Sequence, residues 1–150
     1  MEKIPIAMTI AGSDSGGGAG IEADLKTFSA MGVHGTVALT AITAQNTVDV
    51  FSVQDVELDV IEKQIDVVFE DMGIDAAKTG MLYRSEVIEL VARKIREYGF
   101  PLVVDPVMTA KSGARLLKPE AEESLKKILL PVATVVTPNI FEAEVLSGLK

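Results

Sequence analysis

The chain has 150 residues, of which 48% are apolar and 24% are charged, and its formal net charge is −8. This length and composition suit one globular domain. The negative charge argues against a nucleic-acid or anionic-membrane surface, because phosphate contacts require clustered lysine and arginine. It does not exclude anionic metabolites, since one placed lysine or a bound Mg²⁺ reverses the local field. The sequence has no cysteine, so disulfide frameworks and thiolate metal sites are excluded.

The first elements predicted are a strand, a glycine-rich turn, a helix and a second strand. Ile4–Ile10 is a nearly continuous apolar run, which predicts a buried strand; it is too short to span a membrane, and the charge before it is too balanced for a secretory signal. After the turn, apolar residues at helical spacing predict a helix that ends near Gly32. The segment Thr36–Thr43 is rich in β-branched residues and predicts one further strand.

The rest of the chain alternates in the same way. Asp49–Leu58 is ambiguous, although its alternating apolar residues fit a short edge strand. The elements predicted after it are a helix from Leu58 to Met72 closed by Gly73, a strand at Ile74–Lys78, a helix capped by Ser85 and ending before Gly99, a strand at Pro101–Val107, a loop around Gly113, a helix with Pro119 in its first turn, a strand at Ala133–Asn139 and a last helix from about Asn139 to Ser147.

Strands that alternate with helices predict an α/β fold with a mostly parallel central sheet and helices on both faces. In such sheets ligands bind beyond the carboxyl ends of the strands. Polar and special-geometry residues follow the predicted strands at that edge. These segments are Gly12–Asp14, Thr43–Asn46, Lys78–Met81, Asp105–Val107 and Thr137–Asn139.

The glycine-rich turn "AGSDSGGGAGIEADLK" matches neither of the two common phosphate-binding motifs. A Walker loop requires a lysine that this register lacks, and the dinucleotide fingerprint from Gly16 requires a glycine where Ile21 stands. Asp14 lies within the turn, and Glu22 and Asp24 lie in the first turn of the predicted helix. Their negative charges would repel a polyphosphate that carries no metal ion. The turn is therefore either a tight strand-to-helix connection or a wall for a small neutral ligand whose polar atoms Asp24 or a neighbour fixes.

Five blocks occur in order along the chain: "AGSDSGGGAGIEADLKTFSAMGVHG", "TAITAQNT", "KTGM", "VVDPVMTAKSGARLL" and "TPNIFEAEVLSG". Together they resemble the hydroxymethylpyrimidine/phosphomethylpyrimidine kinases of thiamin biosynthesis, which are ribokinase-like proteins related to pyridoxal kinase. The match extends from Met8 to Gly148. The departures from the family pattern are small: Glu22 stands where glutamine is more common, and Thr79 where isoleucine is common.

The resemblance implies that the glycine turn borders the pocket of the phosphoryl acceptor rather than ATP. It implies that the aminopyrimidine is surrounded by Gly12, Ala19, Asp24, Gln45, Met81 and Val107, the last two as apolar contacts. Gln45 suits this role because its amide offers a donor and an acceptor in one plane. From the residues alone, Gln45 and Asn46 equally fit a solvated turn, Met81 fits ordinary core packing, and the single histidine, His34, fits a surface loop.

The resemblance also assigns the nucleotide side. Asp105, Asn139 and Glu142 are implied to lie beside the ATP phosphates, with Asp105 and Glu142 binding Mg²⁺ through water; hard oxygen ligands suit that ion. Asn139 and Glu142 alone fit a helix cap as well. Lys111 is implied to be the catalytic lysine of a flap that stabilises transferred charge, although a solvated loop lysine is the ordinary alternative.

The family sequences continue beyond this match with a glycine-rich anion hole that holds the residue activating the hydroxymethyl group, and this motif does not occur here. We therefore expect residues 1–150 to be the amino-terminal portion of a single ribokinase-like domain, without full activity alone. The implied activity is ATP- and Mg²⁺-dependent phosphorylation of 4-amino-5-hydroxymethyl-2-methylpyrimidine and of its monophosphate. The resemblance further implies a cytoplasmic protein that is a homodimer at full length. The alternatives are a pyridoxal kinase and a non-catalytic pyrimidine-binding module.

Overall fold

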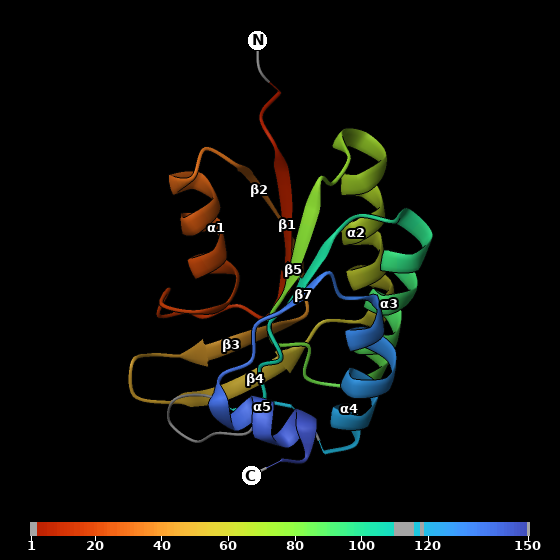
Figure 1. The fold of residues 1–150 in the computed structure, drawn as a ribbon. Coiled ribbons are helices and arrows are strands. Elements are labelled where there is room, and N and C mark those ends of the chain that lie inside the picture. The colour runs from red at the N-terminus through yellow and green to blue at the C-terminus, as the bar shows by residue number, and fades with distance from the viewer. Residues whose placement is uncertain (1–2, 110–115, 118, 150) are drawn as a thin grey trace.

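Five parallel strands form the centre of the protein, in the spatial order β2-β1-β5-β6-β7 (Figure 1). A computed structural model describes residues 3–109, 116–117 and 119–149. The strands are β1 (Ile6–Ala11), β2 (His34–Leu39), β5 (Ala76–Thr79), β6 (Leu102–Val104) and β7 (Val135–Val136). The fully aligned register of β1 and β2, from Ile6 opposite His34 to Ala11 opposite Leu39, makes this pair the longest of the sheet.

The order of the strands creates a topological switch point between β1 and β5. From β1 the chain moves outward to β2, and it then returns across β1 to form β5 on the other side. Crevices beyond the carboxyl ends of two such strands are the usual ligand sites of open α/β sheets. The segments that leave this edge are Gly12 after β1 and Gly80 after β5.

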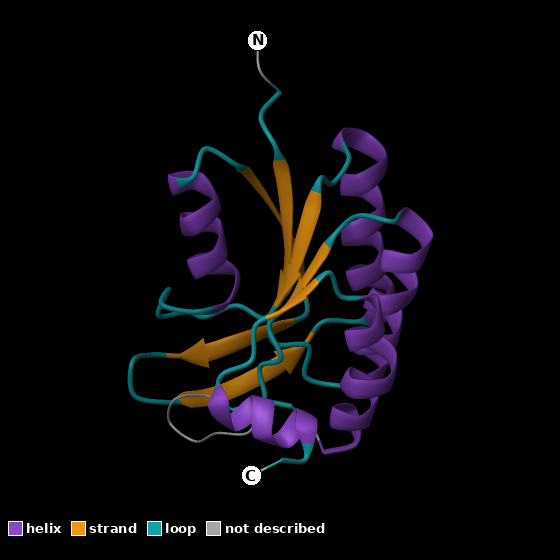
Figure 2. Cartoon of the chain, in the orientation of Figure 1, coloured by secondary structure: helices purple, strands orange, loops and turns teal. Residues whose placement is uncertain are grey.

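Helices cover both faces of the sheet (Figure 2), which confirms the α/β architecture predicted from the sequence. Helix α1 (Gly20–Ala30) lies on one face, and α2 (Leu58–Met72) and α3 (Ser85–Tyr98) lie on the other. Helix α4 (Pro119–Ser124) continues as a π-helical turn (Leu125–Leu129) and a short 3-10 turn (Leu130–Val132), and α5 (Ile140–Ser147) follows β7. None of the helices in the described part of the chain has the length and apolarity that a membrane crossing requires.

The core lies between the sheet and the α2–α3 layer. Met8 and Ile10 of β1 are fully buried there, as are Ile61 and Ile65 of α2 and Ile88 of α3. The spacing of apolar residues therefore predicted correctly which side of α2 and of α3 faces the core. Helix α1 has no fully buried residue, because its apolar side chains are only half-covered by β1 and β2.

The prediction of one strand over Thr36–Thr43 is wrong. The chain forms two strands there, and β3 (Ala41–Gln45) leaves the parallel sheet to pair antiparallel with β4 (Val50–Asp55) in a separate hairpin. Thr40 marks the break: its amide donates to the Ala11 carbonyl at 2.9 Å, and its hydroxyl donates to the Met81 carbonyl at 2.7 Å. These two bonds hold Thr40 at the sheet edge, so the chain turns away after it. The ambiguous segment after Asp49 is the second strand of the hairpin.

The helix ends predicted at glycines agree with the structure, and those predicted elsewhere agree less well. Gly73 and Gly99 follow α2 and α3 with positive φ values of 77° and 74°, as predicted. The prediction that Ser85 caps α3 is wrong. Arg84 occupies the N-cap position of this helix, and its side chain makes no capping hydrogen bond. Strands β6 and β7 are shorter than their predicted segments, since proline follows each of them closely. The predicted loop around Gly113 lies outside the described residues.

Candidate functional site

The glycine turn is organised around the carboxylate of Asp14. Its Oδ1 accepts the amide hydrogen of Gly16 at 2.8 Å, and its Oδ2 accepts those of Gly18 and Ala19 at 2.9 and 2.8 Å. The Asp14 side chain is 5% exposed. Amide groups at the start of a helix form an anion site, and here the protein's own carboxylate occupies it. The turn therefore offers no free amide cluster at Gly16, Gly18 and Ala19 for a phosphate group.

Serine side chains attach this turn to the β3–β4 hairpin. The amide of Thr43 donates to Ser13 Oγ at 3.0 Å, and the Thr43 hydroxyl donates to the Ser13 carbonyl at 2.7 Å. Further along, the amide of Gln45 donates to Ser15 Oγ at 2.8 Å. On the helix side, Glu22 accepts the amide hydrogen of Asp14 at 2.7 Å. The turn, the start of α1 and the hairpin are thus one hydrogen-bonded unit.

Two glycines allow the turn to pass close to neighbouring atoms. Gly20 has φ +56°, and a Cβ there would collide with the carbonyl oxygen of Gly12. A Cβ on Gly12 would collide with the terminal methyl group of Met81, which is a flexible side-chain end. Gly20 is therefore required by backbone geometry, whereas a side chain at position 12 would require only the end of Met81 to move.

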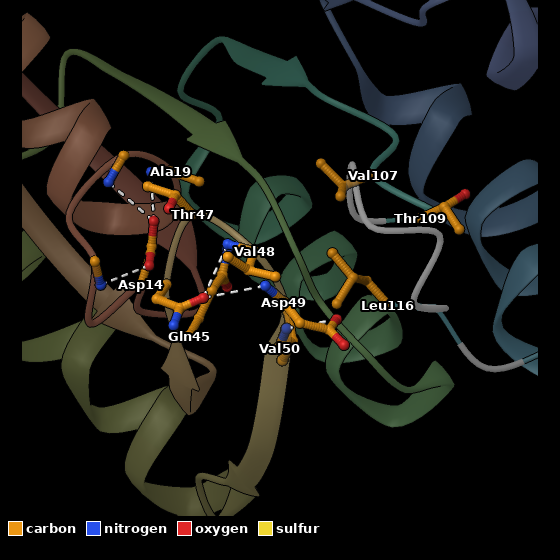
Figure 3. Close-up of a pocket in the computed structure, with 13 residues that line it drawn as sticks. Asp14, Ala19, Gln45, Thr47, Val48, Asp49, Val50, Val107, Thr109 and Leu116 are labelled. Carbon is orange, nitrogen blue, oxygen red and sulfur yellow. Dashed lines mark hydrogen bonds between the residues drawn. The ribbon is translucent and has the colours of Figure 1, made fainter.

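A cavity of about 370 Å³ lies against this turn. Figure 3 shows Asp14 and Ala19 on the turn, with Val107, Thr109 and Leu116 across from them. The volume falls in the usual range for small-molecule sites. The cavity is bounded by the turn, the hairpin and the segment after β6, and its lining residues are Asp14, Gly16, Gly18, Ala19, Gln45, Asn46, Thr47, Val48, Asp49, Val50, Val107, Thr109 and Leu116.

Three of the six residues expected around the acceptor line this cavity: Ala19, Gln45 and Val107. Gly12 and Met81 do not line it, because both are buried behind the turn, where they contact each other. Lys111 lies outside the described residues. His34 is exposed, as expected, although it begins β2 rather than lying in a loop.

Asp24, the remaining residue expected around the acceptor, is bound within the protein instead of lining the cavity. Its carboxylate accepts hydrogen bonds from the Lys78 ammonium, with Nζ–Oδ1 and Nζ–Oδ2 distances of 3.1 and 3.0 Å, and from the Thr9 hydroxyl at 2.7 Å. Lys78 Nζ also lies 3.6 Å from Asp105 Oδ2. The expected contact of Asp24 with the ligand stays a prediction.

The nucleotide-side residues Asp105, Asn139 and Glu142 lie beyond β6 and at the start of α5. Asn139 and Glu142 form a capping box, in which each side chain accepts the other's backbone amide hydrogen at 2.9 Å. Burial raises the pKa of Asp105 above its ordinary value; the charge of Lys78 opposes this, and the charge of Glu142 adds to it. The two carboxylates are therefore close enough to interact electrostatically.

The oxygen donors at this edge fit a Mg²⁺ ion held largely by water and phosphate. Asp105 and Glu142 supply the hard carboxylate oxygens that Mg²⁺ prefers, and one or two carboxylates are its usual protein ligands beside phosphates. Within residues 3–109, 116–117 and 119–149, no three carboxylate or histidine side chains gather into a complete metal cage. The capping box holds Glu142 in one orientation, and its side chain is 7% exposed.

Several lining residues gave no clear signal in the sequence. Thr47 to Asp49 lie in the turn of the hairpin, and Val50 begins β4. Asn46 Oδ1 shapes that turn by accepting the amide hydrogens of Val48 and Asp49 at 2.9 and 3.1 Å. An asparagine two residues before the bonded amide is a known turn signal. Leu116 and Thr109 were not identifiable, because they reach the cavity only through the tertiary path of the segment after β6.

The fold is that of the ribokinase-like vitamin kinases. The structure of phosphomethylpyrimidine kinase from Clostridium difficile 630 matches with a TM-score of 0.91 and 54% identity, over 99% of this chain and 64% of that one. A pyridoxal kinase from Staphylococcus aureus, in complex with AMP-PCP and pyridoxal, matches with a TM-score of 0.86 and 43% identity, over 98% and 52%.

The chain belongs to the phosphomethylpyrimidine kinase family, whose sequence model matches residues 14–150. A hydroxymethylpyrimidine/phosphomethylpyrimidine kinase of Bacillus subtilis (strain 168) is 55% identical over 144 residues, which cover 95% of this chain and 53% of that protein. The chain spans about half the length of the curated relatives it matches.

Proposed function

We propose that this protein phosphorylates 4-amino-5-hydroxymethyl-2-methylpyrimidine and its monophosphate at the expense of ATP, in thiamin diphosphate biosynthesis. The observation that carries the proposal is the occupied anion site of the glycine turn. Because Asp14 accepts the amides of Gly16, Gly18 and Ala19, the cavity beside it favours an uncharged ring over a polyphosphate. Membership of the phosphomethylpyrimidine kinase family supports the same assignment.

Gln45 is the residue that we assign to recognition of the pyrimidine. Its backbone is fixed by Ser15, and its side chain lies at the cavity, where Thr43 Oγ1 is 3.5 Å from Gln45 Oε1. A ring nitrogen and an exocyclic amino group together require one donor and one acceptor in a plane, which a side-chain amide supplies. Ala19 and Val107 provide apolar contact with the ring faces. Gly12 and Met81 support this wall from behind.

ATP is assigned to the opposite side of the switch point, beside Asp105, Asn139 and Glu142. Mg²⁺, when bound there, would neutralise phosphate charge, which is the main requirement of phosphoryl transfer. The chain's own part is to hold two carboxylates in place, Glu142 through its capping box with Asn139. Lys111 is proposed as a second source of positive charge toward the transferred group.

The test compares the 150-residue chain with a version extended to the length of its relatives, each supplied with MgATP and either the pyrimidine or pyridoxal. ADP formation by the extended chain with the pyrimidine, and none by residues 1–150, is the expected result. No ADP from the extended chain with either acceptor would overturn the kinase assignment. Ligand-induced thermal stabilisation without ADP from either chain would instead support a binding module.

A pyridoxal kinase is the second candidate, because the Staphylococcus aureus pyridoxal kinase shares this fold at 43% identity. Both acceptors are flat heterocycles with a hydroxymethyl group, so the same wall suits either. Turnover of pyridoxal alone would favour this candidate. A homodimer and a cytoplasmic location remain predictions from the resemblance, and light scattering of the extended protein tests the first.

A further inference from the structure

A chain of three charged side chains crosses the switch point between β1 and β5. Asp24 extends from α1, Lys78 from β5, and Asp105 follows β6. The ammonium of Lys78 is hydrogen-bonded to both oxygens of Asp24 and lies 3.6 Å from Asp105 Oδ2. The three side chains are 24%, 17% and 35% exposed, in the order Lys78, Asp24, Asp105. Charges this far from water interact more strongly than an exposed surface pair.

Asp24 is fixed from a second direction as well. The hydroxyl of Thr9, a fully buried residue of β1, donates to Asp24 Oδ2 at 2.7 Å. Asp24 is thereby held in a single orientation by two neighbouring strands. Lys78 is in turn held by its two hydrogen bonds to the Asp24 carboxylate, at 3.1 and 3.0 Å.

These contacts connect the two sides of the proposed reaction. Helix α1 begins at Gly20, directly after the glycine turn, so Asp24 moves with the acceptor wall. Asp105 belongs to the nucleotide side. Lys78 is the cation that lies between the two carboxylates, and without it Asp24 and Asp105 would face each other with like charges.

We propose that Lys78 is a positioning residue that fixes the separation of the acceptor wall and the nucleotide-side carboxylate by binding Asp24 and Asp105 together. This inference rests on the proposed function. Lys78 does not line the cavity, so its proposed role is to place other groups. Loss of Lys78 should therefore lower kcat more than it raises the KM for the acceptor.

The test uses the family-length protein carrying Lys78→Met, Lys78→Arg or, as a charge-matched control, Lys127→Met. Lys127 pairs with Glu123 at an exposed site remote from the switch point. We expect Lys78→Met to lower kcat at least about ten-fold, which corresponds to about 1.4 kcal/mol, with the KM for the pyrimidine changed less than about three-fold. Lys78→Arg should restore most of kcat, and Lys127→Met should match the wild type. A kcat within two-fold of wild type for Lys78→Met, or no rescue by Lys78→Arg, would overturn the proposal.

Asp24→Asn gives an independent variant where Lys78→Met does not fold. Because the two residues act as a unit, the double variant Asp24→Asn/Lys78→Met should lose no more than the poorer single variant; losses that multiply would overturn the proposal. A crystal structure of Lys78→Met adds a readout that needs no activity: Asp105 displaced from Asp24 supports the role, and unchanged carboxylates contradict it. This arm remains decisive even when the wild type forms no ADP, which would refute only the proposed function.

Discussion

The backbone amide of Ala19 donates a hydrogen bond at 2.8 Å to Oδ2 of Asp14, which lies five positions earlier in the chain. This bond, with those from Gly16 and Gly18, places a carboxylate where a phosphate lies in phosphate-binding loops. The turn resembles an anion-binding loop in shape but carries its anion in its own sequence. Its stability should therefore depend on that one side chain.

Asp14→Asn is expected to destabilise the protein by about 1–3 kcal/mol. The asparagine NH₂ group is a donor, so backbone amides that face it lose the carboxylate oxygen that accepted their hydrogen bonds. Urea unfolding of the two proteins measures the difference. Asp71→Asn, at an exposed position, is the control and should change stability by less than about 0.5 kcal/mol. Equal stabilities of Asp14→Asn and the wild type would show that the three hydrogen bonds are unimportant for the turn.

Gln45→Ala should weaken binding of the pyrimidine by about ten-fold, the effect of losing one or two hydrogen bonds, and should leave nucleotide binding unchanged. Isothermal titration with each ligand separates the two affinities. Gln54→Ala, on the exposed strand β4 of the same hairpin, is the matched control. Equal weakening toward both ligands would remove Gln45 from the acceptor pocket.

Gly20→Ala and Gly32→Ala form a matched pair, since both glycines have positive φ, +56° and +73°. The added methyl group at Gly32 meets open space, so only the backbone cost of about 1–2 kcal/mol is expected. At Gly20 it collides with the Gly12 carbonyl, and the loss of stability should be larger by at least about 1 kcal/mol. Chemical denaturation measures both; similar losses would mean that the turn relaxes freely.

Thr79→Val is expected to stabilise the protein. Within the described residues, Oγ1 of Thr79 is buried without a hydrogen-bond partner, and valine has the same shape without the hydroxyl. Removing this unpaired hydroxyl should raise the free energy of unfolding by about 1 kcal/mol. Thr9→Val is the control, because the Thr9 hydroxyl donates to Asp24 and its loss should destabilise. Loss of stability in Thr79→Val would indicate that a bound water satisfies this hydroxyl.

The ion cluster between α2 and α3 predicts a pH dependence of stability. A hydrogen bond from Arg93, and then one from Lys94, lower the pKa of Glu62 to about 2 from an ordinary 4.5. Because the folded pKa lies below the unfolded one, the stabilisation is complete above about pH 4.5 and is lost as the pH falls toward 2. Glu62→Gln should flatten the stability profile in this window, as measured by urea unfolding at several pH values.

Glu123 is the control for this pH dependence. It pairs with Lys127 at 2.8 Å, but both side chains are well exposed to solvent, so the pair should contribute little. Glu123→Gln is expected to leave the acid limb of the stability profile unchanged. An equal effect of the two substitutions would mean that net charge, and not the Glu62 contacts with Arg93 and Lys94, governs acid unfolding.

The helices, their glycine ends and the parallel sheet were predictable because they depend on local patterns. The stripe through Ile61 and Ile65 has helical period, and Gly73 ends that helix at positive φ. The hairpin was not predictable, because Thr36–Thr43 is uniformly β-prone and the turn at Thr40 depends on bonds to Ala11 and Met81. Those partners are distant in sequence, and no local rule identifies them.

The candidate site divides in the same way. Val107 ends the predicted strand Pro101–Val107, so its place at the carboxyl edge could be inferred. Gln45 was placed at that edge by a predicted strand that the structure divides, and it reaches the cavity from the hairpin instead. That the charge of Asp14 disfavours a polyphosphate stays a prediction, and its inward hydrogen bonds to the turn were not foreseen. The resemblance assigned Asp24 to the acceptor. Its contact with Lys78 was not foreseen, because Lys78 lies 54 residues away and a lysine within a strand gives no sign of its partners.

The bonds from Ser13 and Ser15 to the hairpin have a consequence for how related proteins accommodate different heterocycles. They connect the glycine turn and the hairpin, which are two of the cavity's three walls. Neither wall can move away from the cavity alone without breaking these hydrogen bonds. Val107, Thr109 and Leu116, the described lining residues of the third wall, take no part in these three hydrogen bonds. Adaptation to a larger or smaller ring is therefore expected to accumulate in this third wall.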